Sequence, residues 1–317
     1  MKKELAIFLL LAVLCAIVTA LNPRFVSASN LQNTGRLIGA FGIFSLGLGL
    51  VIITGGIDLS VGSAFALLGV LLSIMLTEWR VPWPAAVLAV LAVGALLGWI
   101  HGMLITRLGL QPFIVTLCGL LLYRGLARFI ADDETKGFGD SAGFETLQRL
   151  ATGSLLHVPT PFVLLTVIGV VMWVILHRSV YGRHLFATGR NETAARYSGV
   201  NTHRVVVSAY VILGVLTGVS AIVFAFYTNS VSPSSHGNFF ELYGIAAAVL
   251  GGCSLRGGEG SVLGILLGTT LLQVLQNLVN LLGIPSSLNF AVMGSVILVG
   301  VVGDQLLQRR AVRVRTK

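Results

Sequence analysis

Ten apolar segments, separated by short polar stretches, cover most of this 317-residue chain and restrict its fold more than any other feature. A helix needs about 20 mostly apolar residues to cross a bilayer, and it must satisfy its own backbone hydrogen bonds there. Hydrophobic residues make up 55% of the chain and charged residues only 10%, against about 25% charged residues in soluble domains. The sequence therefore predicts an all-α integral membrane protein with about ten transmembrane helices in a bundle packed through small residues. The predicted spans are residues 5–21, 37–54, 61–77, 84–105, 112–131, 161–176, 205–227, 242–253, 262–282 and 288–307.

The positive charges indicate which way the spans face, because Lys and Arg gather in short loops on the cytoplasmic side. With the N-terminus inside and ten crossings, most of the 21 Lys and Arg, including the basic tail after residue 307, fall on the inner side. Segment 242–253 is short enough to be re-entrant or interfacial. If it did not cross the membrane, the basic tail would face outward, against the charge rule. We therefore predict that this segment crosses as a short or broken span. We expect a multi-pass protein of the cell inner membrane with both termini in the cytoplasm.

The first segment follows two lysines and is either a cleaved secretory signal or a retained anchor. Its apolar run exceeds the core of about 7–15 residues that is usual for a signal, which favours the anchor. The net charge of +9 does not indicate nucleic-acid binding, because the basic residues lie between apolar runs that belong in the lipid bilayer.

Two loops are long. Residues 132–160 are rich in acidic side chains and form the predicted periplasmic loop, whereas residues 178–204 carry five arginines against the single acid Glu192 and form the predicted cytoplasmic loop. No Ser- or Pro-rich linker interrupts the chain. Residues 1–317 are therefore predicted to be one transmembrane domain.

The cytoplasmic loop contains a short predicted helix. Asn191 is a good N-cap, Glu192 suits the positive end of a helix, and Gly199 suits the position after the last turn. A helix of about two turns is unstable alone, so we expect it to dock on a partner protein, with a helix lying on the membrane surface as the alternative. The residues expected in this contact are Arg190, Asn191, Glu192, Ala194, Ala195, Arg196, Tyr197, Ser198 and Gly199.

Glycine recurs every four residues in two spans, which lets a neighbouring backbone approach closely. We predict helix packing at Gly94, Gly98 and Gly102 and at Gly260, Gly264 and Gly268. Two glycine-rich turns, at residues 55–63 and 257–262, share a pattern that either marks an internal repeat or arises wherever two spans meet tightly.

Polar residues inside the spans are the candidates for a solute path. Amides either bond neighbouring spans or line a wet path, and they donate and accept hydrogen bonds as sugar hydroxyls do. Asp58 and Ser60, at the start of the third span, either cap that helix or join the path. Arg124 and Arg128 are expected to reach the external headgroups, with contact to a solute or a binding protein as the alternative. The amides that share one face of the ninth span are Gln273, Gln276, Asn277 and Asn280.

The chain contains no recognisable catalytic motif. It has no His-Glu-x-x-His zinc motif and no Gly-x-Ser-x-Gly nucleophile elbow, and no lysine is followed by Ser or Thr as a phosphate-binding loop requires. Cys15, Cys118 and Cys253 lie in apolar runs without the spacing of a disulfide framework or a metal site. We therefore expect a transport subunit that binds no cofactor or metal itself. If ATP drives it, another chain must bind the ATP.

Four stretches in this order and spacing resemble one family over nearly the whole chain. They are residues 56–63 (GIDLSVGS), 112–117 (PFIVTL), 191–200 (NETAARYSGV) and 250–255 (LGGCSL) followed by Gly257-Gly258. The chain is similar to the ribose/rhamnose-type permeases of bacterial ABC importers, in the branched-chain amino acid/ribose permease superfamily.

This resemblance implies a permease that moves a monosaccharide. It also implies a dimer of two permease copies or close paralogues, ATP and Mg²⁺ on separate ATP-binding subunits docked at the 190–199 helix, and a periplasmic sugar-binding protein. The chain departs from the family pattern at His101, Cys118 and Cys253, which leaves the solute open. A furanosyl signalling molecule and a branched-chain amino acid are the alternatives within the superfamily. A passive solute channel and a membrane-bound enzyme are the alternatives from other classes.

Overall fold

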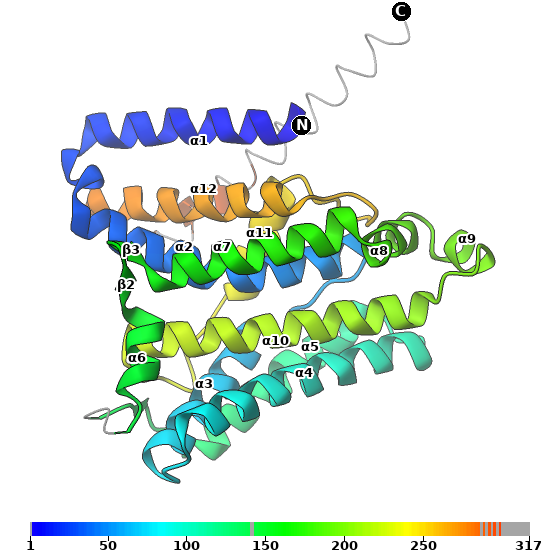
Figure 1. The fold of residues 1–317 in the computed structure, drawn as a ribbon, viewed down its shortest axis with the longest axis horizontal. Coiled ribbons are helices and arrows are strands. Elements are labelled where there is room, and N and C mark those ends of the chain that lie inside the picture. Colours follow the sequence, from blue (N-terminus) through cyan, green and yellow to red (C-terminus); the bar gives the residue numbers. More distant parts are fainter. Residues whose placement is uncertain are drawn as a thin grey trace, which may run out of the picture.

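The computed structural model describes residues 2–139 and 143–285, together with isolated positions between 288 and 298. Apart from those positions, the predicted tenth span and the basic tail lie outside the described residues. The described helices, shown in Figure 1, are α1 (Lys2–Leu21), α2 (Ala28–Ile53), α3 (Val61–Thr77), α4 (Trp83–Arg107), α5 (Pro112–Ile130), α6 (Glu145–Thr152), α7 (Thr160–Trp173), α8 (Val180–Arg190), α9 (Glu192–Tyr197), α10 (Thr202–Thr228), α11 (Phe240–Leu250) and α12 (Val262–Leu281).

Two short antiparallel ribbons stand at one end of the bundle. β1 (Lys136–Gly137) pairs with β4 (Ser230–Val231), and β2 (Ser154–Leu155) pairs with β3 (Val158–Pro159). The ribbons and α6 therefore belong to the loops that connect α5 with α7 and α10 with α11. This is the end that the charge pattern predicts to be periplasmic, and α9 stands at the opposite end of the molecule (Figure 1).

The other nine predicted spans all correspond to helices, and seven of these are long and apolar enough to cross a membrane. The two shorter ones are α3, with 17 residues, and α11, with 11 residues. At 1.5 Å per residue, α11 covers about 16 Å, which is roughly half of a 30 Å hydrocarbon core. The predicted shortness of the eighth segment is confirmed, and its crossing of the membrane stays a prediction.

Local sequence signals set several helix boundaries. Proline occupies the first turn of α4, α5 and α7, where its missing N–H costs no hydrogen bond. Ser27, Ser179 and Ser261 cap α2, α8 and α12, each accepting a hydrogen bond from the backbone N–H three residues further on. The cap at Ser179 starts a helix within the predicted cytoplasmic loop, so most of residues 178–204 are helical.

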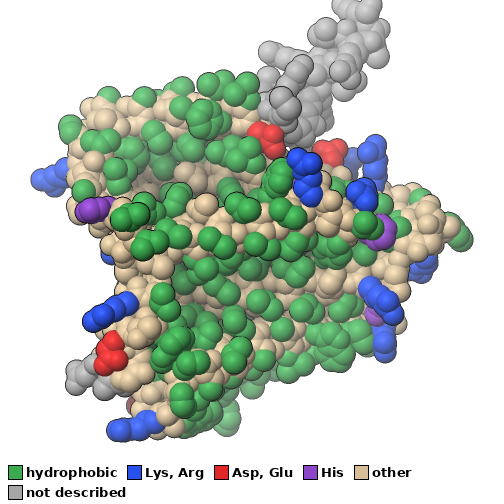
Figure 2. All heavy atoms as spheres, in the orientation of Figure 1, with side chains coloured by type: hydrophobic (Ala, Val, Ile, Leu, Met, Phe, Trp, Pro, Cys, Tyr) green, Lys and Arg blue, Asp and Glu red, His purple; other side chains and the backbone are tan. Residues whose placement is uncertain are grey.

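Helix α2 lies at the centre of the bundle. It packs against α7, α10, α11 and α12, and nearly all of its second half is buried. Helix α1, by contrast, packs mainly on α12 and leaves most of its apolar side chains exposed. Apolar side chains cover the visible face between the two ends, and basic side chains gather at those ends (Figure 2). This distribution is the one expected of a chain whose sides face lipid.

The glycines of α4 bring its backbone onto α10. A Cβ atom at Gly94 would overlap the carbonyl oxygen of Gly214, and one at Gly98 would overlap the carbonyl oxygen of Tyr210. Gly102 faces the Cα atom of Val207 in the same way. Any larger residue at these positions would push the two helices apart.

The second glycine series divides between a helix and a turn. Gly264 and Gly268 lie on α12 and face backbone carbonyls of α11, at Gly251 and Ala247. Gly260 does not continue this stripe, because Ser261 caps α12 and the helix begins only at Val262. It lies in the preceding turn with a φ of +159°.

Candidate functional site

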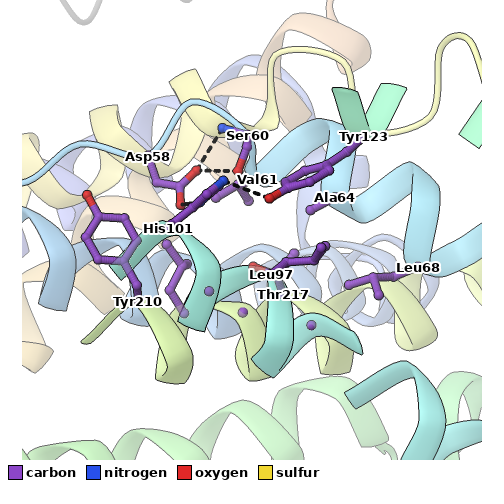
Figure 3. A pocket seen from close by; sticks show the side chains of 14 residues that line it. Asp58, Ser60, Val61, Ala64, Leu68, Leu97, His101, Tyr123, Tyr210 and Thr217 are labelled. Carbon is purple, nitrogen blue, oxygen red and sulfur yellow. Dashed lines mark hydrogen bonds and ion pairs between the residues drawn. The ribbon is translucent and has the colours of Figure 1, made fainter. Parts of the chain in front are cut away.

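A buried carboxylate, Asp58, forms the centre of a polar cluster between α3, α4, α5 and α10 (Figure 3). Its Oδ2 lies 3.3 Å from Nδ1 of His101, on α4, and its Oδ1 accepts hydrogen bonds of 2.7 Å from both the backbone N–H and the hydroxyl of Ser60. The hydroxyl of Tyr123, on α5, lies 2.8 Å from Nε2 of His101. Asp58 and His101 are each only 3% exposed.

The turn after α2 carries Asp58 into this position. Gly55 has a φ of +85°, which favours glycine, and the chain then runs without helix to Ser60. The hydroxyl of Tyr210, on α10, donates a 3.1 Å hydrogen bond to the carbonyl oxygen of Ile57. The turn is thus held from the opposite side of the cluster, next to the carboxylate.

The cluster gives each polar atom a complementary partner. With Nδ1 of His101 donating to Asp58, Nε2 is left to accept from the hydroxyl of Tyr123. Ionisable side chains are expensive at membrane depth and mark functional paths by default. The sequence reading singled out Asp58 and Ser60 but noted His101 only as a departure from the family and gave Tyr123 no role. A histidine and a tyrosine on apolar helices must each have a hydrogen-bond partner, and this requirement could have pointed to His101 and Tyr123 from the sequence.

A small cavity adjoins the cluster. Its volume is about 20 Å³, enough for about one water molecule and far too small for a sugar. Gly94, Gly98 and Gly214 line it, so it lies where α4 and α10 meet backbone to backbone. The hydroxyl of Thr217 also lines it, and this buried oxygen has no hydrogen-bond partner among the described residues. The cavity therefore offers a free hydroxyl as well as the carboxylate cluster.

Arg124 holds the segment that precedes α11. Its guanidinium donates hydrogen bonds to the carbonyl oxygens of Pro233 and His236, both 2.9 Å, and of Gly62, 3.3 Å. The carboxylate of Glu241, which is 7% exposed, interacts with the same guanidinium and with the backbone of Gly62. The expectation that Arg124 reaches the headgroups is wrong, because its donors are taken by backbone carbonyls at the starts of α3 and α11.

The neighbouring Arg128 behaves differently. Its Nε and Nη2 atoms donate hydrogen bonds of 2.6 and 2.8 Å to the two carboxylate oxygens of Asp133, and both side chains are exposed. These hydrogen bonds lower the pKa of Asp133. On the same loop, Lys136 pairs with Glu78 at 3.0 Å, and this contact raises the pKa of the lysine. Both pairs fasten the 132–160 loop to the ends of α3 and α5.

The amides of α12 lie apart from Asp58. The side chains of Asn277 and Asn30 exchange hydrogen bonds of 2.8 and 3.1 Å, which join α12 to α2. Gln273 is buried, and its Oε1 atom has no hydrogen-bond partner among the described residues, whereas Gln276 is partly buried and Asn280 is exposed. Helix α12 packs mainly on α1, α2 and α11, whereas the carboxylate cluster lies among α3, α4, α5 and α10. The structure thus does not bring the two predicted sets of path residues together.

The predicted helix of the cytoplasmic loop is α9. The side chain of Asn191 accepts a 2.9 Å hydrogen bond from the N–H of Ala194, and Gly199 follows the helix with a φ of +84°. Glu192 binds both Arg196 and Thr202, each at 3.0 Å, which fastens α9 to the start of α10. The residues predicted for the partner contact that are exposed are Arg190, Asn191, Glu192, Ala194, Arg196, Tyr197, Ser198 and Gly199. Ala195 is the exception, because it is buried against the chain itself.

Three backbone segments meet beside α9. The N–H of Gly258 donates a 2.8 Å hydrogen bond to the carbonyl oxygen of Ile53, at the end of α2. A Cβ atom at Gly189, near the end of α8, would overlap that same carbonyl. A Cβ atom at Gly257 would lie 2.6 Å from the carbonyl oxygen of Gly189 and 2.9 Å from the backbone nitrogen of Gly55. We call this contact of residues 53–55, 189 and 257–258 the glycine junction. It joins α8 to both glycine-rich turns.

Among the described residues, no group of three or more His, Cys, Asp or Glu side chains lies close enough to hold a metal ion. The three cysteines are unpaired. Cys253 is buried, Cys15 is partly buried and Cys118 is exposed. Neither Cys15 nor Cys118 lies in the polar cluster.

Comparison with known proteins places these features in a family. Residues 30–301 match the family described as "Branched-chain amino acid transport system / permease component". The chain is 38% identical to the ribose import permease protein RbsC of Bacillus subtilis, over 96% of this chain and 93% of the relative. It is 36% identical to RbsC of Haemophilus influenzae, over 95% and 92%. It is also 36% identical to the autoinducer 2 import system permease protein LsrD of Klebsiella pneumoniae, over 98% and 94%. No solved structure matches the chain.

Proposed function

Since the chain belongs to the permease component family of branched-chain amino acid transport systems, we propose that it is the membrane-spanning subunit of an ATP-driven importer that carries a monosaccharide of the ribose type. The observation that carries this proposal is the polar cluster of Asp58, His101 and Tyr123 beside a small cavity at the α4–α10 contact. The chain itself breaks no bond in the solute. ATP and Mg²⁺ are bound by a separate subunit.

The chemistry of the cavity favours a sugar over an amino acid. A sugar presents hydroxyls, which donate to a carboxylate and both donate to and accept from imidazole, phenol and threonine groups. A branched-chain amino acid brings a carboxylate that needs a cation, and no Lys or Arg lines this cavity. The ribose import permeases among the relatives support the same choice. A furanosyl signalling molecule, which is also rich in hydroxyls, is the second candidate, supported by the similarity to autoinducer 2 permeases.

In this proposal the cavity is the collapsed form of the sugar site. Helices α4 and α10 touch there through Gly94, Gly98 and Gly214, so a small shift of one helix widens the space without moving large side chains past one another. The sugar hydroxyls then lie next to Asp58 and Thr217. Alternating access follows if the site opens to one side of the membrane at a time.

The coupling helix in this proposal is α9. The glycine junction connects α9 to the turn that carries Asp58. Helix α8 ends at Arg190, just before α9, and Gly189 touches the carbonyl of Ile53, which lies five residues before Asp58. A push on α9 by an ATP-binding subunit would reach the turn that carries the carboxylate. A passive channel has no need of such a route.

The remaining assignments concern partners and orientation. We propose that a second permease copy or a close paralogue completes the transporter, and that a periplasmic sugar-binding protein delivers the solute at the end that carries the β-ribbons. The N-terminus, the basic tail and α9 lie in the cytoplasm. Helix α12, which carries the four amides, is proposed to join spans through the bond between Asn277 and Asn30, while Gln273, Gln276 and Asn280 remain secondary candidates for the path.

The sharpest test uses Thr217→Val in the assembled importer. Valine has nearly the shape of threonine, and the hydroxyl that the substitution removes has no hydrogen-bond partner among the described residues, so the melting temperature of the protein should stay the same. Uptake of radiolabelled ribose into proteoliposomes that contain the ATP-binding subunit and the sugar-binding protein should fall several-fold.

Thr269→Val is the matched control, because Thr269 is buried but bonds only its own helix at Ile265. Equal uptake by the Thr217 and Thr269 variants would count against a sugar site at this cavity. Ribose uptake without the ATP-binding subunit would favour the passive channel.

A further inference from the structure

An open groove of about 420 Å³ lies between α4 and α10, close to the end of the bundle that carries α9. Trp99 and Arg107 belong to the wall formed by α4. His203, Arg204, Val207 and Val211 belong to the wall formed by α10. This groove is separate from the small cavity, which lies deeper between the same two helices.

The groove changes from basic to apolar along its length. Arg107 is the last residue of α4 and Arg204 the third residue of α10, so both stand at the same end. Trp99 lies eight residues before Arg107, about 12 Å along the helix, and Val211 lies seven residues beyond Arg204. The hydrocarbon of one leaflet is about 15 Å thick. The groove thus has a basic rim and apolar walls nearly as long as the hydrocarbon of one leaflet.

The two arginines at the rim have no acidic partner in the part of the chain that the structure describes. Arg107 and Arg204 are exposed, and neither forms an ion pair among the described residues. No acidic residue lines the groove. Arginine binds phosphate oxygens through two parallel hydrogen bonds, and basic pockets between transmembrane helices suit anionic lipid headgroups.

We propose that this groove binds one anionic phospholipid of the surrounding leaflet. The phosphate lies between Arg107 and Arg204, and one acyl chain follows Trp99, Val207 and Val211. An acidic protein partner would account for the two arginines but not for the long apolar walls below them. A bound lipid joins the end of α4 to the start of α10, and so braces the two helices whose glycine contact lies directly behind, at Gly102.

The first experiment counts bound lipid. Native mass spectrometry of the detergent-purified importer complex should show retained phosphatidylglycerol, and added phosphatidylglycerol should raise its melting temperature more than phosphatidylcholine does. Arg107→Gln with Arg204→Gln should weaken phosphatidylglycerol binding at least tenfold. Val211→Trp, which fills the groove and keeps the charges, should weaken it as well. The control is Arg183→Gln with Arg256→Gln, which removes two exposed arginines from outside the groove and should bind as the unmodified chain does.

Any of the following results would overturn the proposal. One is unchanged lipid binding in the double groove variant. Another is an equal loss in the control pair, which would mean general attraction between charges. The third is unchanged binding in Val211→Trp, or loss of a protein subunit from the Arg107/Arg204 variant while its lipid stays, which would identify plain headgroup contact or a protein interface.

A second measurement needs no change at the rim. Phosphatidylglycerol brominated on its acyl chains should quench the tryptophan fluorescence of the complex more strongly than brominated phosphatidylcholine, because Trp99 lines the groove. Trp99→Phe should remove this difference between the two lipids. Equal quenching by both lipids in the unmodified complex would contradict a selective site.

Discussion

The backbone N–H of Gly258 donates a 2.8 Å hydrogen bond to the carbonyl oxygen of Ile53, which joins the turn after α11 to the end of α2. Gly189 packs against the same carbonyl from the end of α8. Two stretches with similar glycine patterns, 200 residues apart in the sequence, therefore touch each other and the segment that leads to α9. The proposed route from the ATP-binding subunit to Asp58 runs through this contact.

Replacing Gly189 tests the route. The Cβ atom of Gly189→Ala would overlap the carbonyl of Ile53, so the three segments must separate. We expect the assembled importer to hydrolyse ATP with little dependence on the sugar-loaded binding protein, and to lose most ribose uptake. The measurement is ATPase rate against uptake rate in the same proteoliposomes. If both rates stay coupled in a variant that folds, the glycine junction does not transmit the signal.

The α4–α10 contact should be the most sensitive to added volume. Gly98→Ala places a methyl group against the carbonyl of Tyr210, and overpacking of this kind costs about 1–3 kcal/mol. The melting temperature of the detergent-purified protein should fall accordingly. Gly125→Ala is the control, because nothing lies within 4 Å of that position on α5. An equal melting temperature for Gly98→Ala and the unmodified chain would show that the two helices tolerate separation.

The charge of Asp58 should matter more than its volume. Asp58→Asn keeps the shape of the side chain but replaces one acceptor oxygen by an NH2 donor. It also removes the negative charge that orients His101. Ribose uptake should fall about tenfold, the equivalent of roughly 1.4 kcal/mol. His101→Asn keeps a hydrogen-bonding side chain on α4 but removes the imidazole that links Asp58 to Tyr123, so it should change the preference among sugars. Uptake competition among pentoses and hexoses measures both variants.

Replacing each of the two arginines of α5 by glutamine should change the melting temperature by very different amounts. Arg124→Gln leaves carbonyl oxygens of Pro233, His236 and Gly62 without their donor, and unsatisfied buried acceptors cost about 1–3 kcal/mol. Arg128→Gln loses only an exposed pair with Asp133 and should leave the melting temperature unchanged. Thermal unfolding of the two variants side by side decides this. A larger loss for Arg128→Gln would reverse the assignment.

The orientation can be tested at Tyr197, which is 89% exposed on α9. A Tyr197→Cys variant, made after Cys15, Cys118 and Cys253 are replaced by serine or alanine, should react with a membrane-impermeant maleimide only when the cells are permeabilised. Labelling of intact cells would place α9 outside and remove the basis for docking an ATP-binding subunit there.

Much of the architecture followed from the sequence because membrane spans depend on local properties. Apolar length located nine helices of the described part and indicated that the segment at α11 is short. The cap at Asn191 and the glycine at 199 located α9. These signals act within a few residues, so no knowledge of packing is needed to read them.

The site was less predictable because its partners are distant in the sequence. Asp58 and Tyr123 meet through His101 only when α3, α4 and α5 are side by side. Helix periodicity placed the amides of α12 on one face but could not say that Asn277 would find Asn30 on α2. Arg124 was expected at the headgroups because its carbonyl partners lie more than 100 residues further along the chain. They belong to a loop that enters the bundle, and no local sequence pattern indicates that it does so.

The pairing of Asp58 with His101 also constrains how the protein is made. The two residues are 43 positions apart, and a ribosome adds about 5–20 residues per second, so the carboxylate waits about 2–9 s for its imidazole. An unpaired carboxylate is not stable in lipid during that interval. We therefore expect nascent α2 and α3 to stay beside water or the insertion machinery until α4 emerges, so that the three helices enter the bilayer as one unit.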